Sequence, residues 1–412
     1  MSAGGARGLD LLVVGPLPIR SDGNETFHFG ASVFYEALLP RLAARGHRVR
    51  AVAEVPPSRS GLRRGAISWT VPGIEIAEQP LTYLAGSAGS APRRLAHVRR
   101  EAAALLDAIL ARERPDVVVI GRETLARVLL GPCRRYGVPT LLIAHGSPTA
   151  GLLDGVFPAT LARELVARFR EVDALVAVAP YLAEILGRLG LTGVRVIPNV
   201  ADPAVFRPEP KDPSLLRLLG LTPDQIVIGH VSNLAPSKRP MDVVRSAVQV
   251  LASDPAIAYL IVGDGPCRAE MAALAVREGI AASVHFVGEV AHREVPRYLS
   301  LCDVVLLPSA RHGVPLLVYR EAQACGRVVL ASDIPAAREA IEDGETGALF
   351  PMGDLAELIA KALALAHDHS WRARIGAQAR AAAETRTPEG WVDAYETELR
   401  SVARRAARRR PA

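Results

Sequence analysis

The stretch LCDVVLLPSARHGVPLLVYREAQACG, residues 301–326, constrains the fold more than any other part of this 412-residue chain. Its apolar run Val304 to Leu307 has the length and the β-branched content of an interior parallel strand. Two prolines and a glycine then prevent the strand from continuing, and the composition from Leu316 to Gly326 is helical. Because free N–H groups at a helix start favour an anion, the stretch predicts an anion-binding loop, with Glu321 inside the helix.

Length and hydrophobicity limit the class of protein. A chain of 412 residues, half of them hydrophobic, predicts two globular domains of about 200 residues each. No apolar run approaches the roughly 20 residues that cross a bilayer. The first ten residues lack the apolar core of a signal peptide, so we expect a cytoplasmic protein.

The cysteine spacing and the charge distribution indicate which kinds of site and partner the chain can have. The four cysteines are widely spaced without a C-x-x-C pair, which favours reduced thiols over a metal site. Nearly all the positive charge is arginine, which suggests a bacterial gene. Residues 1–205 carry 24 Arg against 18 Asp and Glu. A weak contact of this half with a membrane surface or an anionic acceptor is one interpretation of the excess, and a solvated basic face is the other.

Strands and helices alternate along most of the chain, which predicts an α/β fold with parallel sheets. The first half begins with a strand at Leu9 to Val14 and a helix up to Arg45. Further along, the strand TLLIAHG is followed by a predicted long helix through Arg170. His145 closes that strand at its carboxyl end, where ligands of open α/β sheets bind. His145 therefore has two alternative interpretations, a structural role and a ligand contact.

Several motifs of the second half occur together, namely VIPNVADPAVF, HVSNLAPSKRP, LIVGDGPCRAEM, VHFVGEV and EAQACGRVVLASDIPAAREAIEDGETGALF. This set resembles the family-four retaining glycosyltransferases, whose B-type fold (GT-B) has two Rossmann-like lobes. The resemblance implies two parallel-sheet domains facing across a cleft. It implies an acceptor-binding domain at 1–205, a nucleotide-sugar-binding domain at 206–386, and a C-terminal helix and basic tail at 387–412 that return to the first lobe.

The same resemblance implies the activity. The family moves a hexose from a UDP-, GDP- or dTDP-linked donor to a hydroxyl-bearing acceptor with retention of configuration. The chain has no D-x-D motif, so we expect catalysis without a metal or another cofactor, the nucleotide sugar being a co-substrate. Lys238 would then be the chief cation that stabilises the leaving diphosphate. No nucleic-acid partner is expected, and the sequence does not indicate the oligomeric state.

The same resemblance implies the donor-binding positions, one motif at a time. Glu321 matches the carboxylate that accepts from the ribose hydroxyls. The remaining expected donor contacts are Gly23 and Asn24 in the first loop, Asn233, Lys238, the main chain at Val287 and Gly288, and the N–H groups of Gly313, Val314, Leu316 and Leu317. The turn GDGP, Gly263 to Pro266, is either a phosphate contact or an ordinary helix-starting turn.

Two of the chain's departures from the family pattern change charged residues of the expected site. Asn233 stands where the family usually has an arginine, and Arg239 or Arg311 are candidates to replace its charge. The family's first glutamate falls on His312 or Gly313, because the loop is one residue longer. We therefore expect Lys238, His145 and His312 to be the catalytic residues, with His312 contacting the donor sugar in its neutral form.

Two further functions remain alternatives on these residues. The missing glutamate and the substitution at Asn233 are compatible with a non-catalytic protein that binds a sugar nucleotide. A sugar-nucleotide epimerase on the same fold is the other alternative. It needs acid and base carboxylates, and the sequence offers no obvious pair beyond Glu321.

Overall fold

The computed structural model describes residues 7–17, 19–20, 26–27, 30–55, 73–77, 81–82, 92–153, 155–310 and 317–409. The chain divides into two compact units, one of Met1–Pro198 with Glu389–Ala412 and one of Asn199–Pro388. Each unit contains its own parallel sheet.

The sheet of the first unit has the strand order β10-β9-β8-β7-β1-β4-β5, and β6 pairs with β4. All pairings in it are parallel. Its strands are β1 (Asp10–Gly15), β4 (Arg48–Val55), β5 (Ile74–Ile76), β6 (Leu81–Thr82), β7 (Val117–Ile120), β8 (Thr140–Ala144), β9 (Ala174–Ala177) and β10 (Arg195–Val196). Two short strands, β2 (Ile19–Arg20) and β3 (Thr26–Phe27), form a separate antiparallel pair in the first loop.

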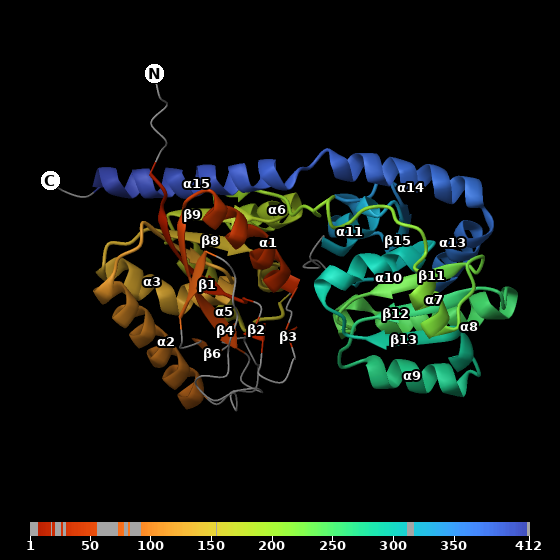
Figure 1. Cartoon of the computed structure of the whole chain (residues 1–412). Helices are drawn as coiled ribbons and strands as arrows, with labels where there is room; N and C mark the ends of the chain where they lie inside the picture. Colours follow the sequence, from red (N-terminus) through yellow and green to blue (C-terminus); the bar gives the residue numbers. More distant parts are fainter. Residues whose placement is uncertain are drawn as a thin grey trace, which may run out of the picture. The chain divides into compact units, whose positions relative to one another are not determined.

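Helices cover both faces of this sheet (Figure 1). They are α1 (Gly30–Ala44), α2 (Pro92–Arg112), α3 (Ala126–Arg135), α4 (Ser147–Leu153), α5 (Ala159–Phe169), α6 (Pro180–Arg188) and α15 (Pro388–Arg409), with a 3-10 turn η2 (Glu123–Leu125) before α3. The prediction of one long helix through Arg170 is wrong. Gly155 has a left-handed φ of 65° and Pro158 stands before α5, so the segment is two helices, α4 and α5.

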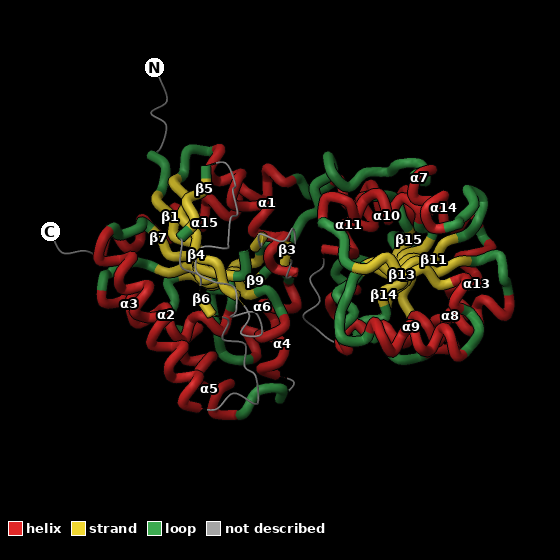
Figure 2. The backbone as a smooth tube through the Cα atoms, turned by 60° about the horizontal axis from the view of Figure 1, so that its bottom comes forward, coloured by secondary structure: helices red, strands yellow, loops and turns green. Residues whose placement is uncertain are grey.

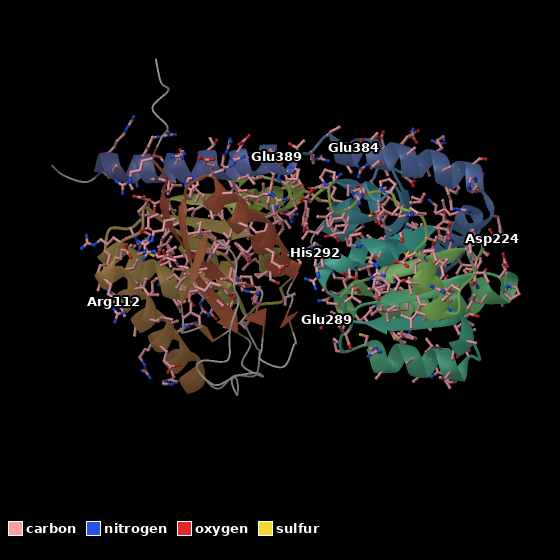
Figure 3. The ribbon with its side chains drawn as sticks, viewed as in Figure 1. Arg112, Asp224, Glu289, His292, Glu384 and Glu389 are labelled. Atoms are coloured by element: carbon pink, nitrogen blue, oxygen red, sulfur yellow. The ribbon has the colours of Figure 1, made fainter. Side chains whose placement is uncertain are left out.

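The C-terminal helix α15 packs on the first unit, to which its residues belong. Arg45 at the end of α1 donates from Nη1 to Glu396 at 2.9 Å and from Nη2 to the carbonyl of Glu389, which Figure 3 labels. Trp391 and Tyr395 are buried on the inner side of α15. The expected return of this helix to the first lobe is confirmed.

The second unit has the strand order β13-β12-β11-β14-β15-β16, with every pair parallel. Its strands are β11 (Val227–Val231), β12 (Ala258–Val262), β13 (Val284–Gly288), β14 (Val304–Leu307), β15 (Val328–Ser332) and β16 (Ala348–Phe350). The strand predicted at Val304 to Leu307 is therefore confirmed to the residue.

Two layers of helices enclose the second sheet, with α8, α9 and α13 on one face and α10, α11 and α14 on the other (Figure 2). The helices are α7 (Pro213–Leu219), α8 (Pro240–Ser253), α9 (Arg268–Arg277), α10 (Val295–Leu301), α11 (Leu317–Ala324), α12 (Pro335–Arg338), α13 (Leu355–His367) and α14 (His369–Glu384). Short 3-10 turns are η3 (Pro236–Lys238), η4 (Ala281–Ser283) and η5 (His292–Glu294).

Both sheets reverse their strand order at one point, between β1 and β7 in the first unit and between β11 and β14 in the second. In open α/β sheets, ligands bind at the carboxyl ends of the strands on either side of such a point. The loops after these four strands are therefore the places where the fold offers a site. Among the described helices, none has both the length and the apolar character of a membrane span.

Candidate functional site

The loop after β11, residues 232–235, is held against the loop after β12. The Ser232 N–H donates to the Val262 carbonyl at 3.1 Å, and the Cys267 N–H donates to the Leu234 carbonyl at 3.1 Å. A Cβ on Gly263 would lie 1.8 Å from the Ser232 oxygen, and Gly263 has a φ of 119°. Only glycine fits there, so the GDGP turn allows the two loops to touch.

A buried histidine fixes the hydrogen bonds under this loop. His230 Nδ1 lies 2.8 Å from the Leu306 carbonyl, and its Nε2 lies 2.8 Å from Ser232 Oγ. A carbonyl only accepts, so Nδ1 carries the proton and Ser232 donates its hydroxyl proton to Nε2. Ser232 Oγ in turn accepts from the Leu234 N–H at 3.1 Å. Burial lowers the pKa of His230 to about 4, which keeps the ring neutral.

Lys238 lies at the end of η3, on the β11 side of the strand-order reversal. It is half-buried, and no carboxylate in the described ranges pairs with it. Desolvation by burial lowers its pKa to about 7. Arg239 beside it has a left-handed φ of 47°, and its Nε donates to Asp242 at 2.6 Å. Arg239 is thus engaged along α8, whereas Lys238 is available to an anion.

Glu321 lies in the middle of α11, with only 5% of its surface exposed. Its Oε1 is 2.7 Å from Nε2 of His292, the first residue of η5. The His292 ring also packs against Phe206 at a centroid distance of 5.2 Å. Sequence reasoning missed His292. Its only signal is its place a few residues after the VHFVGEV strand, at the same sheet edge as Glu321.

The other expected donor contacts of the described ranges lie at the same edge of the second sheet. Asn233 is exposed in the loop after β11, Val287 and Gly288 end β13, and Leu317 begins α11. The Gly288 carbonyl accepts from the Gly263 N–H at 2.7 Å, which joins the β13 end to the GDGP turn.

The carboxylate of the GDGP turn is engaged by the turn itself and by the first residue of the helix that follows it. Asp264 accepts from the Gly265 N–H at 2.6 Å and pairs with Arg268 at 3.2 Å. This geometry favours the helix-starting turn over a direct phosphate contact of Asp264.

Six of the sequence-predicted residues lie outside the described residues. They are His312, Gly313, Val314 and Leu316 in the loop after β14, and Gly23 and Asn24 in the first loop. Arg311, a candidate for the missing charge, is also outside. Their roles remain predictions.

In the first unit, His145 follows β8, next to the reversal point between β1 and β7. Its Nε2 is 2.9 Å from the Tyr35 hydroxyl, which also lies 3.0 Å from the Gly121 carbonyl. Burial, with a smaller contribution from Arg122, lowers the pKa of His145 to about 3. The buried Glu123 accepts from the Gly146 N–H and from the Thr149 hydroxyl, which fixes the backbone after His145.

The second unit therefore gathers at one sheet edge a lysine that pairs with no described carboxylate, one buried carboxylate, and the loop 232–235 packed against the glycine-containing GDGP turn. This set suits a ligand with an anionic group and vicinal hydroxyls. Within the described ranges, no three His, Cys, Asp or Glu side chains gather as a metal site would require.

Two family models match the chain, one in each half. Residues 30–205 match the model described as Glycosyltransferase Family 4, and residues 217–382 match the model described as Glycosyl transferases group 1. Among curated relatives, a D-inositol 3-phosphate glycosyltransferase of Rhodococcus erythropolis is 32% identical over 231 residues, 52% of either chain. A 2-deoxystreptamine N-acetyl-D-glucosaminyltransferase of Streptomyces fradiae is 30% identical over 261 residues, 60% of this chain and 61% of the relative. The chain spans about half the length of the first of these relatives.

Solved structures share the fold over nearly the whole chain. The sucrose-phosphate synthase of Thermosynechococcus elongatus has a TM-score of 0.78 at 20% identity, covering 95% of this chain and 98% of that one. The Anabaena protein Alr3699/HepE, crystallised with UDP and glucose, has a TM-score of 0.74 at 20% identity, covering 95% and 100%. These likenesses confirm the GT-B class of fold, with two Rossmann-like parallel sheets.

Proposed function

Since the chain belongs to the family-four glycosyltransferases, we propose that it transfers a sugar from a nucleoside-diphosphate donor to a hydroxyl-bearing acceptor. The observation that carries this proposal is the pair of Lys238 and Glu321 at one edge of the second sheet. Lys238 is a cation with no carboxylate partner among the described residues, and Glu321 is a buried carboxylate. A diphosphate and the two hydroxyls of a ribose are the groups that such a pair recognises.

Lys238 acts on the leaving group. When the bond between the anomeric carbon and the diphosphate breaks, negative charge grows on the departing oxygen, and a positioned ammonium stabilises that charge. The loop that carries Lys238 is fixed beforehand by Ser232, His230 and the close contact with Gly263. The cation therefore needs little reorganisation at the moment of transfer.

The transfer proceeds with retention and without a metal. The acceptor oxygen attacks the anomeric carbon from the face that the diphosphate leaves, and the acceptor proton passes to a leaving phosphate oxygen. This route needs no carboxylate base. It is supported by the absence of a D-x-D motif in the sequence and by the two carboxylates of the site that are already engaged, Asp264 with Arg268 and Glu321 with His292.

Donor and acceptor are tested with a matrix of compounds. UDP-, GDP-, ADP- and dTDP-sugars serve as donors, and UDP-glucose comes first because Alr3699/HepE was crystallised with UDP and glucose. Candidate acceptors include D-inositol 3-phosphate and 2-deoxystreptamine, after the names of two relatives. A thermal-shift screen finds the donor first, because a ligand at 100 times its Kd adds about 2.7 kcal/mol to stability.

Product analysis then separates the alternatives. Transfer of the sugar to the acceptor, with the anomeric configuration read by NMR, supports the proposal. Tight binding of a nucleotide sugar with no product from any acceptor identifies a non-catalytic binder. Conversion of the sugar nucleotide without an acceptor identifies an epimerase. If no donor raises the melting temperature, the proposal is refuted.

A further inference from the structure

A chain of two hydrogen bonds at the carboxyl edge of the first sheet determines which nitrogen of His145 carries a proton. Tyr35 comes from α1, Gly121 follows β7, and His145 follows β8. The Tyr35 hydroxyl is 3.0 Å from the Gly121 carbonyl oxygen and 2.9 Å from His145 Nε2. Tyr35 has no exposed surface, so water does not compete for this hydroxyl.

The direction of each bond follows from the chemistry of the groups. A carbonyl oxygen accepts and never donates, so Tyr35 gives its only proton to Gly121. The Tyr35 oxygen can then only accept from His145, which requires a proton on Nε2. A neutral imidazole carries one proton, so Nδ1 is left as a bare acceptor. No group in the ranges that the structure describes donates to this Nδ1.

The surrounding residues are shaped to admit this contact. A Cβ on Gly121 would lie 2.7 Å from the Tyr35 hydroxyl oxygen, and a Cβ on Gly15 would lie 2.9 Å from the Gly121 Cα. Two glycines at the reversal point therefore make the space that the phenol occupies. Phe34 meets the His145 ring edge to face, with centroids 4.8 Å apart, which restrains the ring plane.

We propose that Tyr35 is a positioning residue that holds His145 in the Nε2–H form, so that Nδ1 can only accept a hydrogen bond from a substrate hydroxyl. This inference rests on the proposed function and adds a specificity rule to it. The ring is neutral throughout the working pH range, because burial keeps its pKa near 3. A substrate that offers a deoxy carbon or a methyl ether at the facing position leaves Nδ1 without a partner, and it should be a poor substrate.

The proton position is measured directly by NMR, without any substrate. The protein is labelled with 15N-histidine, and the His145 signals are assigned by their loss in His145→Gln. We expect a single tautomer with the proton on Nε2 and slow exchange of that proton with water. In Tyr35→Phe we expect fast exchange or a proton shared between both nitrogens.

Tyr395→Phe is the matched control for this measurement. Tyr395 is another fully buried tyrosine in contact with Phe34, at a centroid distance of 5.4 Å, and its hydroxyl bonds to no described residue. Its removal should leave the His145 signals unchanged. A wild-type proton on Nδ1 overturns the inference, and so does an Nε2 proton as slowly exchanging in Tyr35→Phe as in the wild type.

Turnover gives the second arm, measured well below the melting temperature of each variant. Tyr35→Phe should lower kcat/KM about ten-fold, the effect of losing roughly one hydrogen bond, while Tyr395→Phe should not change it. Among monodeoxy donors and acceptors, we expect one compound with a lowered kcat/KM in the wild type. This loss in kcat/KM should disappear in His145→Ala and should largely disappear in Tyr35→Phe. A loss of fold alone would not change this preference.

The two failures are distinguishable. A wild type that transfers no sugar refutes the proposed function and leaves the NMR result standing. An active wild type whose Tyr35→Phe variant keeps its full kcat/KM and its full discrimination against the deoxy compound refutes the positioning role of Tyr35.

Discussion

Donor binding should weaken as the pH rises through 7, because Lys238, the cation of the proposed donor site, titrates there. Burial lowers the pKa of Lys238 from 10.5 to about 7, and no described carboxylate opposes this shift. A bound diphosphate favours the charged ammonium, so binding takes up a proton wherever the free lysine is neutral. The affinity is therefore highest below pH 7 and falls above it.

The magnitude follows from the fraction of protein that carries the proton. With a pKa of about 7, roughly 90% of the free lysine is charged at pH 6 and roughly 3% at pH 8.5. If only the charged form binds tightly, the apparent Kd rises by the inverse of this fraction. The expected change between pH 6 and 8.5 is roughly 30-fold, or about 2 kcal/mol. His230 does not contribute, since its pKa of about 4 keeps it neutral throughout.

Isothermal titration calorimetry of the best donor at half-unit pH steps measures this dependence. A nucleotide sugar is used because its diphosphate is esterified at both ends and does not titrate in this range. Lys238→Arg is the matched control, since a guanidinium stays charged at every pH of the series. Its Kd should be nearly constant above pH 7. A wild-type Kd that changes less than about three-fold between pH 6 and 8.5 would refute the reasoning. An equally large rise of the Kd in Lys238→Arg would refute it too.

Three further outcomes are expected. Glu321→Gln should weaken nucleotide binding roughly 10- to 150-fold, the cost of a charge-assisted hydrogen bond of about 1.5 to 3 kcal/mol. The control Glu357→Gln on α13 should leave the calorimetric Kd unchanged. If Glu321→Gln binds the nucleotide as tightly as the wild type, Glu321 is not part of the site. Gly263→Ala should lower the free energy of unfolding by more than about 3 kcal/mol in urea titrations, because the added Cβ would lie 1.8 Å from the Ser232 oxygen. Gly279→Ala, where φ is also positive (72° against 119° at Gly263) but the surrounding space is open, should cost only about 1 kcal/mol. EDTA should leave the initial rate of transfer within error, and a loss restored by a divalent cation would contradict the metal-free route.

The sequence predicted the parts of the fold that depend on local composition. The strand Val304 to Leu307 was predicted to the residue because it is fully apolar and ends at a proline. The break between α4 and α5 was missed, although Gly155 and Pro158 were both visible. Amphipathic segments on either side of such a break have the same period, so periodicity alone does not separate one helix from two.

The sequence predicted only those residues of the candidate site that lie within a recognisable motif. Lys238 and Glu321 came from motifs, but the partners that orient the site did not. His292 lies 29 residues from Glu321 along the chain, and Tyr35 lies 110 residues from His145. Such contacts depend on which strand ends the fold brings together, and in one sequence nothing links the two residues.

Two histidines show a further limit of prediction from sequence. The sequence gives the residue type, but it does not show which ring nitrogen carries the proton. His230 lies inside the buried strand β11 and His145 directly follows the buried strand β8, and burial keeps both rings neutral. His230 faces the Leu306 carbonyl with Nδ1, so its proton is on Nδ1 and its Nε2 accepts from Ser232. His145 faces a hydroxyl already committed to Gly121, so its proton is on Nε2. The same side chain thus has opposite tautomers in the two units, and each tautomer is set by a carbonyl at a neighbouring strand end. Whether a histidine at a sheet edge donates to a ligand or accepts from it is therefore decided by the strand order, which determines the carbonyl beside it.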